Sequence, residues 1–154
     1  MSRPAAPTSL HLTVITSRSL LVDDEVEFVA CPTTDGEIGI LPHHAPLLSS
    51  LGFGELRIRK TGEEEEYFAI AGGFVQVLPD RVVVMAETAD LAAEIDLERA
   101  EEARREAERA LEAGFIEAAD LARARASLRK ALLRIQVAER RRRPRRGIPG
   151  QDGG

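Results

Sequence analysis

The feature that most constrains the fold of this chain is a change of sequence periodicity near residue 90. Before that point, apolar and polar residues alternate in short runs, as in residues 10–16 and 52–60. Such alternation is typical of half-buried strands. After that point, the sequence consists mainly of Ala, Glu, Arg and Leu, which are strong helix formers. The sequence therefore predicts an α+β chain in which a β domain precedes a helical one.

The strand-like part, residues 9–89, predicts an antiparallel β-sandwich of about ten short strands. Turn signals separate the apolar runs, and Leu56 and Ile58 are expected to point into an aliphatic core. Gly72 and Gly73 lie between two strand-like runs and open no helix, so they predict a bulge or a tight turn. The single cysteine, Cys31, is expected to be a small buried hydrophobe.

The helical part, residues 90–140, predicts an antiparallel helical hairpin. A linker at residues 88–94, which can still touch the sheet, is expected to lead into it. Asp96 has the chemistry of an N-cap, and Gly114 is expected to end the first helix, with the second helix over about 117–140. The expected inner seam consists of Ala100, Ala103, Ala107, Ala110 and Leu111 on the first helix and Leu121, Ala124, Leu128, Ala131, Leu132 and Ile135 on the second. Apolar burial stabilises by about 25 cal/mol per Å², so an alanine seam predicts a weakly held, movable hairpin.

Charge and motif content exclude several classes of function. The chain has 154 residues and a net charge of −5, which disfavours nucleic acid as a partner. A basic and glycine-rich tail, residues 141–154, is predicted to be disordered. A membrane helix needs roughly 18 or more consecutive apolar residues, and the sequence has no such run. We find no nucleophile–base pair, phosphate-binding loop or cluster of metal ligands, so no catalytic or metal residues are predicted.

Three ordered stretches carry a resemblance to a known family: residues 36–47 (GEIGILPHHAPL), 71–74 (AGGF) and 95–100 (IDLERA). With the sheet-then-hairpin layout, the chain resembles the epsilon subunit of the bacterial F-type ATP synthase over about residues 9–140. The resemblance implies a non-catalytic rotor subunit of the central stalk, on the cytoplasmic face of the plasma membrane. It implies that the sandwich contacts the gamma subunit and the c-ring. It also implies that the hairpin can open toward the alpha/beta hexamer and inhibit ATP hydrolysis.

The resemblance also implies a set of residues for a regulatory ATP, with no cofactor required. In ATP-binding members the nucleotide lies against the folded hairpin, and the matching positions here are Asp90, Ile95, Asp96, Arg99, Ala100, Lys130 and Arg134. Lys130 stands where good binders have arginine and lacks the bidentate fork that grips phosphate. The alternative is structural: Asp96 only caps the helix, Arg99 pairs locally, and Lys130 and Arg134 are solvated.

A second set of residues, Glu37, His43 and His44, matches the loop that contacts the c-ring in this family. The family commonly has Gly or Asn at the position of His43, because both residues tolerate a positive φ. Two neighbouring histidines without further ligands predict a turn or a partner contact rather than a metal site. The alternative for the whole chain is a stand-alone nucleotide-sensing β-sandwich protein.

Overall fold

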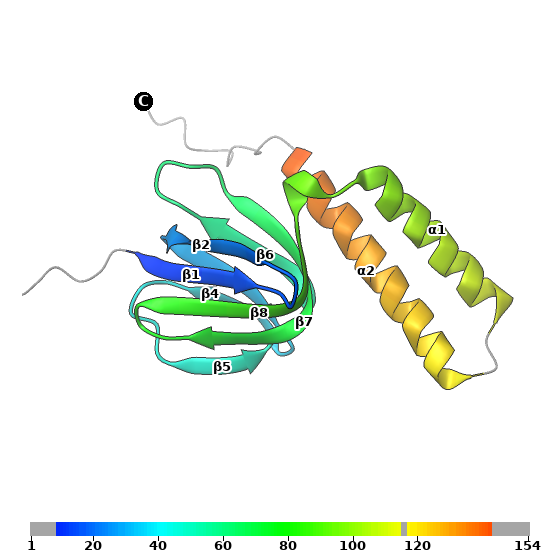
Figure 1. Ribbon diagram of the computed structural model, residues 1–154, viewed down its shortest axis with the longest axis horizontal. Coiled ribbons are helices and arrows are strands. Elements are labelled where there is room, and N and C mark those ends of the chain that lie inside the picture. Colours follow the sequence, from blue (N-terminus) through cyan, green and yellow to red (C-terminus); the bar gives the residue numbers. More distant parts are fainter. Residues whose placement is uncertain (1–8, 115–116, 143–154) are drawn as a thin grey trace, which may run out of the picture.

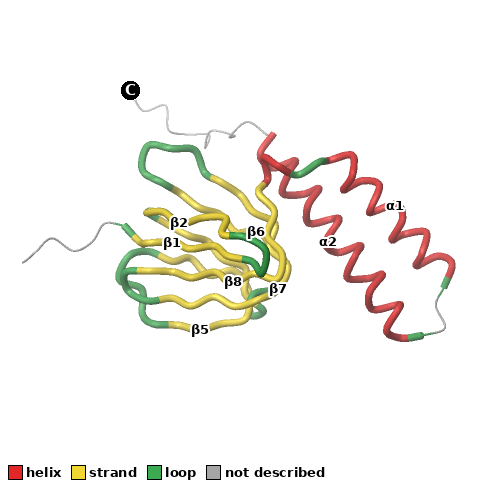
Figure 2. Tube along the Cα trace, viewed as in Figure 1, coloured by secondary structure: helices red, strands yellow, loops and turns green. Residues whose placement is uncertain are grey.

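The molecule consists of a β-sandwich and a helical hairpin that lies beside it (Figures 1 and 2). This computed structural model describes residues 9–114 and 117–142. The predicted order of a sandwich followed by two antiparallel helices is confirmed. The strands occupy one side of the molecule and the two long helices the other, so the hairpin covers only one end of the sandwich (Figure 2).

The sandwich is built from eight strands, not ten. Their hydrogen-bonded order is β2-β1-β8-β7-β6-β3-β4, and β5 pairs separately with β7. All neighbours are antiparallel except β1 and β8, which are parallel. The strands are β1 (Leu10–Ile15), β2 (Leu20–Val26), β3 (Phe28–Thr33), β4 (Gly36–Ile40), β5 (Leu47–Ser50), β6 (Phe53–Arg59), β7 (Glu66–Val77) and β8 (Arg81–Leu91).

The lower strand count has a local cause at Gly72 and Gly73. Both glycines have positive φ values, of 76° and 118°, yet β7 runs through them as one strand. The first half of β7 pairs with β6 and the second half with β5, so the two glycines mark the position where the strand changes partners. Glycine adopts these φ values without the steric cost that a Cβ atom would bring. The predicted bulge or turn is therefore a bend within a single long strand.

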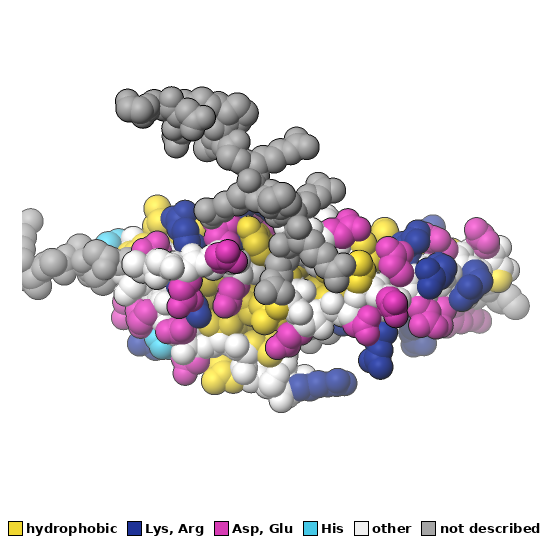
Figure 3. All heavy atoms as spheres, turned by 90° about the horizontal axis from the view of Figure 1, so that it is seen from above, with side chains coloured by type: hydrophobic (Ala, Val, Ile, Leu, Met, Phe, Trp, Pro, Cys, Tyr) yellow, Lys and Arg dark blue, Asp and Glu magenta, His cyan; other side chains and the backbone are white. Residues whose placement is uncertain are grey.

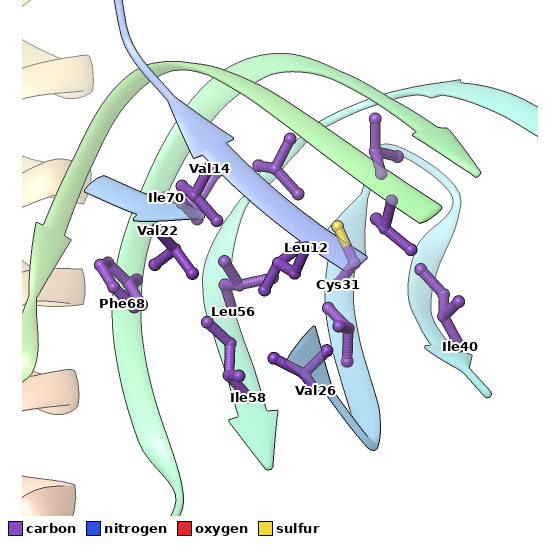
Figure 4. Close-up of a cluster of buried hydrophobic side chains, with 14 of the residues drawn as sticks. Leu12, Val14, Val22, Val26, Cys31, Ile40, Leu56, Ile58, Phe68 and Ile70 are labelled. Carbon is purple, nitrogen blue, oxygen red and sulfur yellow. The ribbon is translucent and has the colours of Figure 1, made fainter. Parts of the chain in front are cut away.

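The core of the sandwich is aliphatic, as predicted. Leu56 and Ile58 of β6 are fully buried. Figure 4 shows Leu12 and Val14 of β1 lying across the interior from Leu56. Cys31 lies in the same cluster, and burial raises the pKa of its thiol to about 12. Thiolate formation at neutral pH is therefore suppressed, which agrees with a packing role for Cys31.

The hairpin consists of α1 (Leu97–Ala113) and α2 (Ala118–Arg142), which pack against each other. Asp96 is the N-cap of α1, because its Oδ1 accepts a hydrogen bond from the Arg99 backbone N–H at 3.2 Å. Gly114 follows α1 with a φ of 80°, which suits its predicted position at the end of the helix.

Several expectations for the hairpin are wrong. Residues 88–91 are not a linker: they continue β8 to Leu91, and a short 3-10 helix, η1 (Ala92–Glu94), follows. In the predicted seam, Ala103 and Leu132 are exposed, so these two side chains are not buried between the helices. Val137 is fully buried although it was not assigned to the seam. Of the predicted tail, Arg141 and Arg142 belong to α2, and the rest lies outside the described residues.

Candidate functional site

The candidate site lies where the hairpin meets the end of the sandwich. The last residues of β8, η1 and the start of α1 follow one another in the chain, and α2 packs against β6, β7 and η1. A small apolar cluster joins the two parts: Val137 of α2 lies against Ala69 and Ala92, with Ile95 and Leu133 at its edge. The junction thus includes Ile95 and Ala92 from the connection itself.

Asp90 and Arg134 form an ion pair across this junction. The Arg134 Nε donates to Asp90 Oδ2 at 2.9 Å, and Nη2 lies 2.9 Å from the same oxygen. About one third of each side chain is exposed. Asp90 belongs to the sandwich and Arg134 to the hairpin, so this pair ties the two parts together.

Lys130 lies one helical turn before Arg134 and is half-buried. Burial lowers the pKa of the Lys130 ammonium, and the positive charges of Arg134 and Arg18 lower it further, while Asp90 raises it. Arg18 comes from the turn between β1 and β2 and is exposed. Arg134 pairs with the Asp90 carboxylate, and the charges of Arg134 and Arg18 both act on Lys130, so the side of Asp90 toward Lys130 is rich in cations.

The remaining predicted ligand residues are arranged differently. Asp96 and Arg99 pair with each other at 3.7 Å, and both side chains are mostly exposed. Ala100 is buried, and α1 and α2 pack against each other. The structure thus brings Asp90, Lys130 and Arg134 together, whereas Asp96 and Arg99 have the local roles of cap and partner. Their role in ATP binding stays a prediction.

In two cavities near the connection, most of the charged side chains in the lining are acidic. A cavity of about 400 Å³ beside the end of β8 includes Asp90 and Glu94 together with Asp23, Asp24, Lys60 and Glu66. A wider hollow at the start of α1 is lined by Ile95, Asp96, Leu97, Glu98, Glu101, Glu102 and Arg105. Carboxylates repel phosphate groups, so neither cavity suits the phosphates of a nucleotide. The cationic side of Asp90, toward Lys130, suits them better.

Two further arginines of α2 contact the sandwich, and sequence reasoning missed their partners. The Arg129 guanidinium lies 4.6 Å from the centre of the Phe53 ring. Arg140 lies 2.9 Å from Glu55 Oε1 and 5.3 Å from the Tyr67 ring centre. Arginines at 129, 134 and 140 lie about five to six residues apart, which does not match a helical repeat, so no periodic signal revealed them. Figure 3 shows acidic and basic side chains closely intermixed on one face of the hairpin.

The predicted c-ring residues occupy two places. His43 has a φ of 70° and its backbone N–H donates to Pro79 O at 2.8 Å, while His44 Nδ1 lies 2.8 Å from Ala45 O. Glu37 is near the start of β4 and the histidines follow the end of that strand. The positive φ expected at His43 is therefore present, but the strand separates Glu37 from the two histidines. The c-ring contact itself stays a prediction.

An exposed row of apolar side chains crosses the outer surface of the sandwich. Phe74 of β7 pairs with Met85 of β8, Met85 pairs with Ile15 of β1, and Ile15 pairs with Leu20 of β2. All four side chains are exposed. We call these four residues the apolar row. Exposed apolar side chains on adjoining strands make this row a candidate contact surface.

Other kinds of site find little support in the described part of the chain. Across residues 9–114 and 117–142 no three His, Cys, Asp or Glu side chains are placed to hold a metal ion. The helices described are too short or too polar to cross a bilayer.

Comparison with known proteins defines the family. The family described as ATP synthase, Delta/Epsilon chain, beta-sandwich domain, matches residues 9–92. The long alpha-helix domain of the same chains matches residues 93–139. This chain therefore belongs to the ATP synthase delta/epsilon chain family. The members of this family are accessory chains of ATP synthase, not its catalytic subunits.

Individual relatives agree with this assignment. An ATP synthase epsilon chain of Dehalococcoides mccartyi is 44% identical over 133 residues, which cover 86% of this chain and 94% of the relative. The epsilon chain of Herpetosiphon aurantiacus is 46% identical over 133 residues, covering 86% and 96%. A chain in the cryo-EM structure of the Euglena gracilis mitochondrial ATP synthase has a TM-score of 0.74 at 22% identity, covering 92% of this chain and 86% of that one. This last likeness concerns the fold alone.

Proposed function

We propose that this chain is a rotor subunit in the central stalk of a proton-translocating ATP synthase, with a hairpin that opposes ATP hydrolysis when it opens. The observation that carries this proposal is the match of both family domains in their order along the chain. One solved chain with this fold belongs to the central stalk and c-ring of the Tetrahymena thermophila enzyme, at a TM-score of 0.56. The names of the relatives do not favour a stand-alone nucleotide-sensing protein.

The sandwich is the part proposed to bind the rest of the rotor. The apolar row offers the gamma subunit a surface that gains from burial, because apolar area removed from water stabilises a contact. The c-ring contact is assigned to the loop with His43 and His44, and to Glu37 on β4. These assignments place the chain on the periphery of the membrane, at the cytoplasmic face of a bacterial plasma membrane.

The hairpin is the part proposed to regulate. Its junction with the sandwich combines a small apolar cluster around Val137 with contacts made by three arginines of α2. Such contacts break at modest cost, so the hairpin can leave the sandwich without unfolding it. Once released, the basic side of α2, including Arg123 and Arg125, would face acidic segments of the alpha/beta hexamer.

ATP is proposed as the regulatory ligand of the docked hairpin. Lys130 and Arg134 would hold its phosphates, with Asp90, Ile95, Asp96, Arg99 and Ala100 as the further residues that the family resemblance implies. The cation excess around Lys130 supports a phosphate position there. Holding ATP against both helices would favour the docked state, because a ligand shifts an equilibrium toward the state that it binds better.

The test is the ATP hydrolysis rate of the assembled complex with the full chain or with residues 117–154 deleted. Deletion should raise the hydrolysis rate and leave assembly intact, because the proposed rotor contacts lie in residues 9–89. An unchanged rate in a complete complex would reduce the hairpin to a structural role. If the chain did not assemble with the gamma subunit at all, the rotor proposal itself would be wrong.

A further inference from the structure

The Asp90–Arg134 pair occupies the position where a phosphate would bind. One carboxylate oxygen, Asp90 Oδ2, lies 2.9 Å from both Nε and Nη2 of Arg134. These two nitrogens form the edge of the guanidinium that binds carboxylates and phosphates in a bidentate manner. A phosphate on the remaining Nη1 side would lie beside an ionised carboxylate, and like charges at such separations repel.

On the side that faces α2, this pair has two further cations, Lys130 and Arg18, nearby. Neither Lys130 nor Arg18 forms an ion pair with any residue in the described ranges 9–114 and 117–142. Arg18 acts on the same position as Arg134, because the positive charges of both arginines lower the pKa of the Lys130 ammonium. β1 runs toward the hairpin, so the turn that carries Arg18 faces it (Figure 1). An anion with more charge than one carboxylate would be stabilised here.

We propose that Asp90 is an internal competitor for phosphate: its carboxylate occupies the anion position formed by Arg134 and Lys130, with Arg18 as a third cation, and a polyphosphate ligand binds by displacing it. This inference rests on the proposal that ATP binds at the hairpin. It reverses the role that the family resemblance implies for Asp90, which is that of a nucleotide ligand. It also adds Arg18, which lies outside the three stretches that carry the resemblance.

Displacing Asp90 has a cost that is visible in the structure. On its other side, Asp90 lines the acidic cavity with Asp23, Asp24 and Glu94. The one lysine of that cavity, Lys60, already pairs with Asp24 at 3.1 Å. A displaced Asp90 carboxylate would therefore lack a cation of its own, which weakens binding of any competing phosphate.

Displacement would not free the hairpin. Asp90 ties the sandwich to Arg134, and its loss would remove that tie. A polyphosphate that contacts Arg18 of the sandwich together with Lys130 and Arg134 of α2 would replace it. The Asp90–Arg134 ion pair is thus replaced by contacts of the ligand with Arg18, Lys130 and Arg134. These contacts also join the sandwich to the hairpin, so the docked state is retained.

The experiment is calorimetric titration of the full chain with inorganic tripolyphosphate and, separately, with ATP. Asp90→Asn keeps the shape of the side chain and removes its charge, so both ligands should bind about tenfold more tightly than to the unmodified chain. Glu94→Gln is the matched control, since it removes the charge of an exposed acid in the same cavity that has no bond to Arg134. It should change either affinity less than about twofold.

Two second-site variants test the cations. In the Asp90→Asn background, Arg134→Ala should abolish the gain in affinity, and Arg18→Ala should reduce it several-fold. An Arg18→Ala variant with unchanged affinity would overturn the part of the inference that concerns Arg18.

The other outcomes separate this inference from the ATP proposal. Weaker or unchanged binding by Asp90→Asn would overturn the competitor role of Asp90. So would the absence of measurable binding of tripolyphosphate and ATP to both the unmodified chain and Asp90→Asn. If Asp90→Asn binds tripolyphosphate more tightly but ATP binds no better than tripolyphosphate, the competitor role stands and the proposed ATP site fails.

Discussion

The sandwich and the hairpin are stabilised by different kinds of contact. Large aliphatic side chains fill the sandwich, and Leu12, Leu56 and Ile70 are fully buried there. The buried residues of the α1–α2 contact are mainly alanines, such as Ala107 and Ala124. Each alanine removes little apolar area from water, so it contributes less than a leucine. The chain therefore joins a part with a large aliphatic core to a part with little apolar burial, without a long linker between them.

The junction between the two parts extends this contrast. It has only a small apolar cluster around Val137, and the arginines at 129, 134 and 140 add contacts to the sandwich. Ion pairs that are partly exposed are weak and are screened by salt. If this contrast holds, variants in the aliphatic core should destabilise the sandwich strongly, whereas variants of the arginines should weaken docking of the hairpin by smaller amounts.

The largest effect is expected from Gly73→Ala in the sandwich. A Cβ atom at this position would lie 2.1 Å from the Met85 carbonyl oxygen, and the residue has a φ of 118°. The combined clash and strain should lower the free energy of unfolding by about 3 kcal/mol or more, measured by urea denaturation. Gly62→Ala is the control, because Gly62 also has a positive φ but has open space around it, and it should cost about 1 kcal/mol. Equal effects would show that the close approach at Gly73 does not matter.

The next largest effect is expected from Leu56→Ala in the core. Leu56 is fully buried, so truncation should lower the free energy of unfolding of the sandwich by about 2–5 kcal/mol. Leu48→Ala, at a side chain that is 68% exposed, should change it by less than about 0.5 kcal/mol. If the two variants unfolded at the same urea concentration, the sandwich would not depend on its aliphatic core as described.

A smaller, local effect is expected from Arg140→Ala. The variant removes the partner of Glu55 and the contact with Tyr67, so docking of α2 should weaken by about 1 kcal/mol, or fivefold in the docking equilibrium. Faster tryptic cleavage within α2, without a change in the unfolding of the sandwich, is the expected result. Arg123→Ala is the control, since Arg123 is exposed and, among the residues that the structure describes, pairs only with Asp120 of its own helix. Equal cleavage rates would contradict the role of Arg140.

The same variant has a pH signature at Glu55. Burial raises the pKa of the Glu55 carboxyl, and the positive charge of Arg140 partly offsets this rise. A carboxyl pKa raised in the folded state stabilises that state fully below the ordinary pKa, and this contribution is lost as the pH rises through the raised value. Arg140→Ala should therefore raise the pKa of Glu55 further and widen the pH window of the loss. Carboxyl chemical shifts measured by NMR across that window are the test.

The smallest effect is expected at His11 on the edge of the sandwich. Hydrogen bonds to Glu25 and Asp23, at 2.9 and 2.5 Å, raise the pKa of the exposed His11 imidazole. The β1–β2 pairing should be fully supported below the ordinary pKa of histidine and should lose this support as the pH rises through the raised value. NMR titration of His11 should show the raised pKa, and His11→Gln should remove the pH dependence of the amide protection factors in β2, which are corrected for the intrinsic exchange rate. A pKa at or below that of a free histidine would contradict the contact.

Most of the architecture could be predicted because strand-like alternation and helix-forming composition occupy separate halves of the sequence. Alternation predicted the sandwich, and helix-forming residues after Asp96 predicted the hairpin, including the N-cap itself. The number of strands was wrong because Gly72 and Gly73 resemble a break in sequence but bend one continuous strand. The linker at 88–91 was wrong because a strand can extend past a change in composition when a neighbour continues to pair with it.

The candidate site was only partly predictable. The family resemblance named Asp90, Lys130 and Arg134, which lie together, but nothing in the sequence indicated that Asp90 already neutralises Arg134. The partners of Arg140 lie on strands far away in the chain, and such contacts leave no local pattern. Long-range pairs of this kind are set by how α2 lies on the sheet, so only the folded structure identifies them.

The central claim is that ionic contacts contribute more than the small apolar cluster around Val137 to holding the hairpin against the sandwich. The most direct measurement is amide hydrogen exchange of the full chain at low and high salt, comparing α2 with β6. We expect exchange in α2 to accelerate several-fold as salt rises from about 0.01 to 1 M, because the screening length falls from about 30 to 3 Å, while β6 stays unchanged. Salt-independent exchange in α2, or equal acceleration in both elements, would contradict the claim.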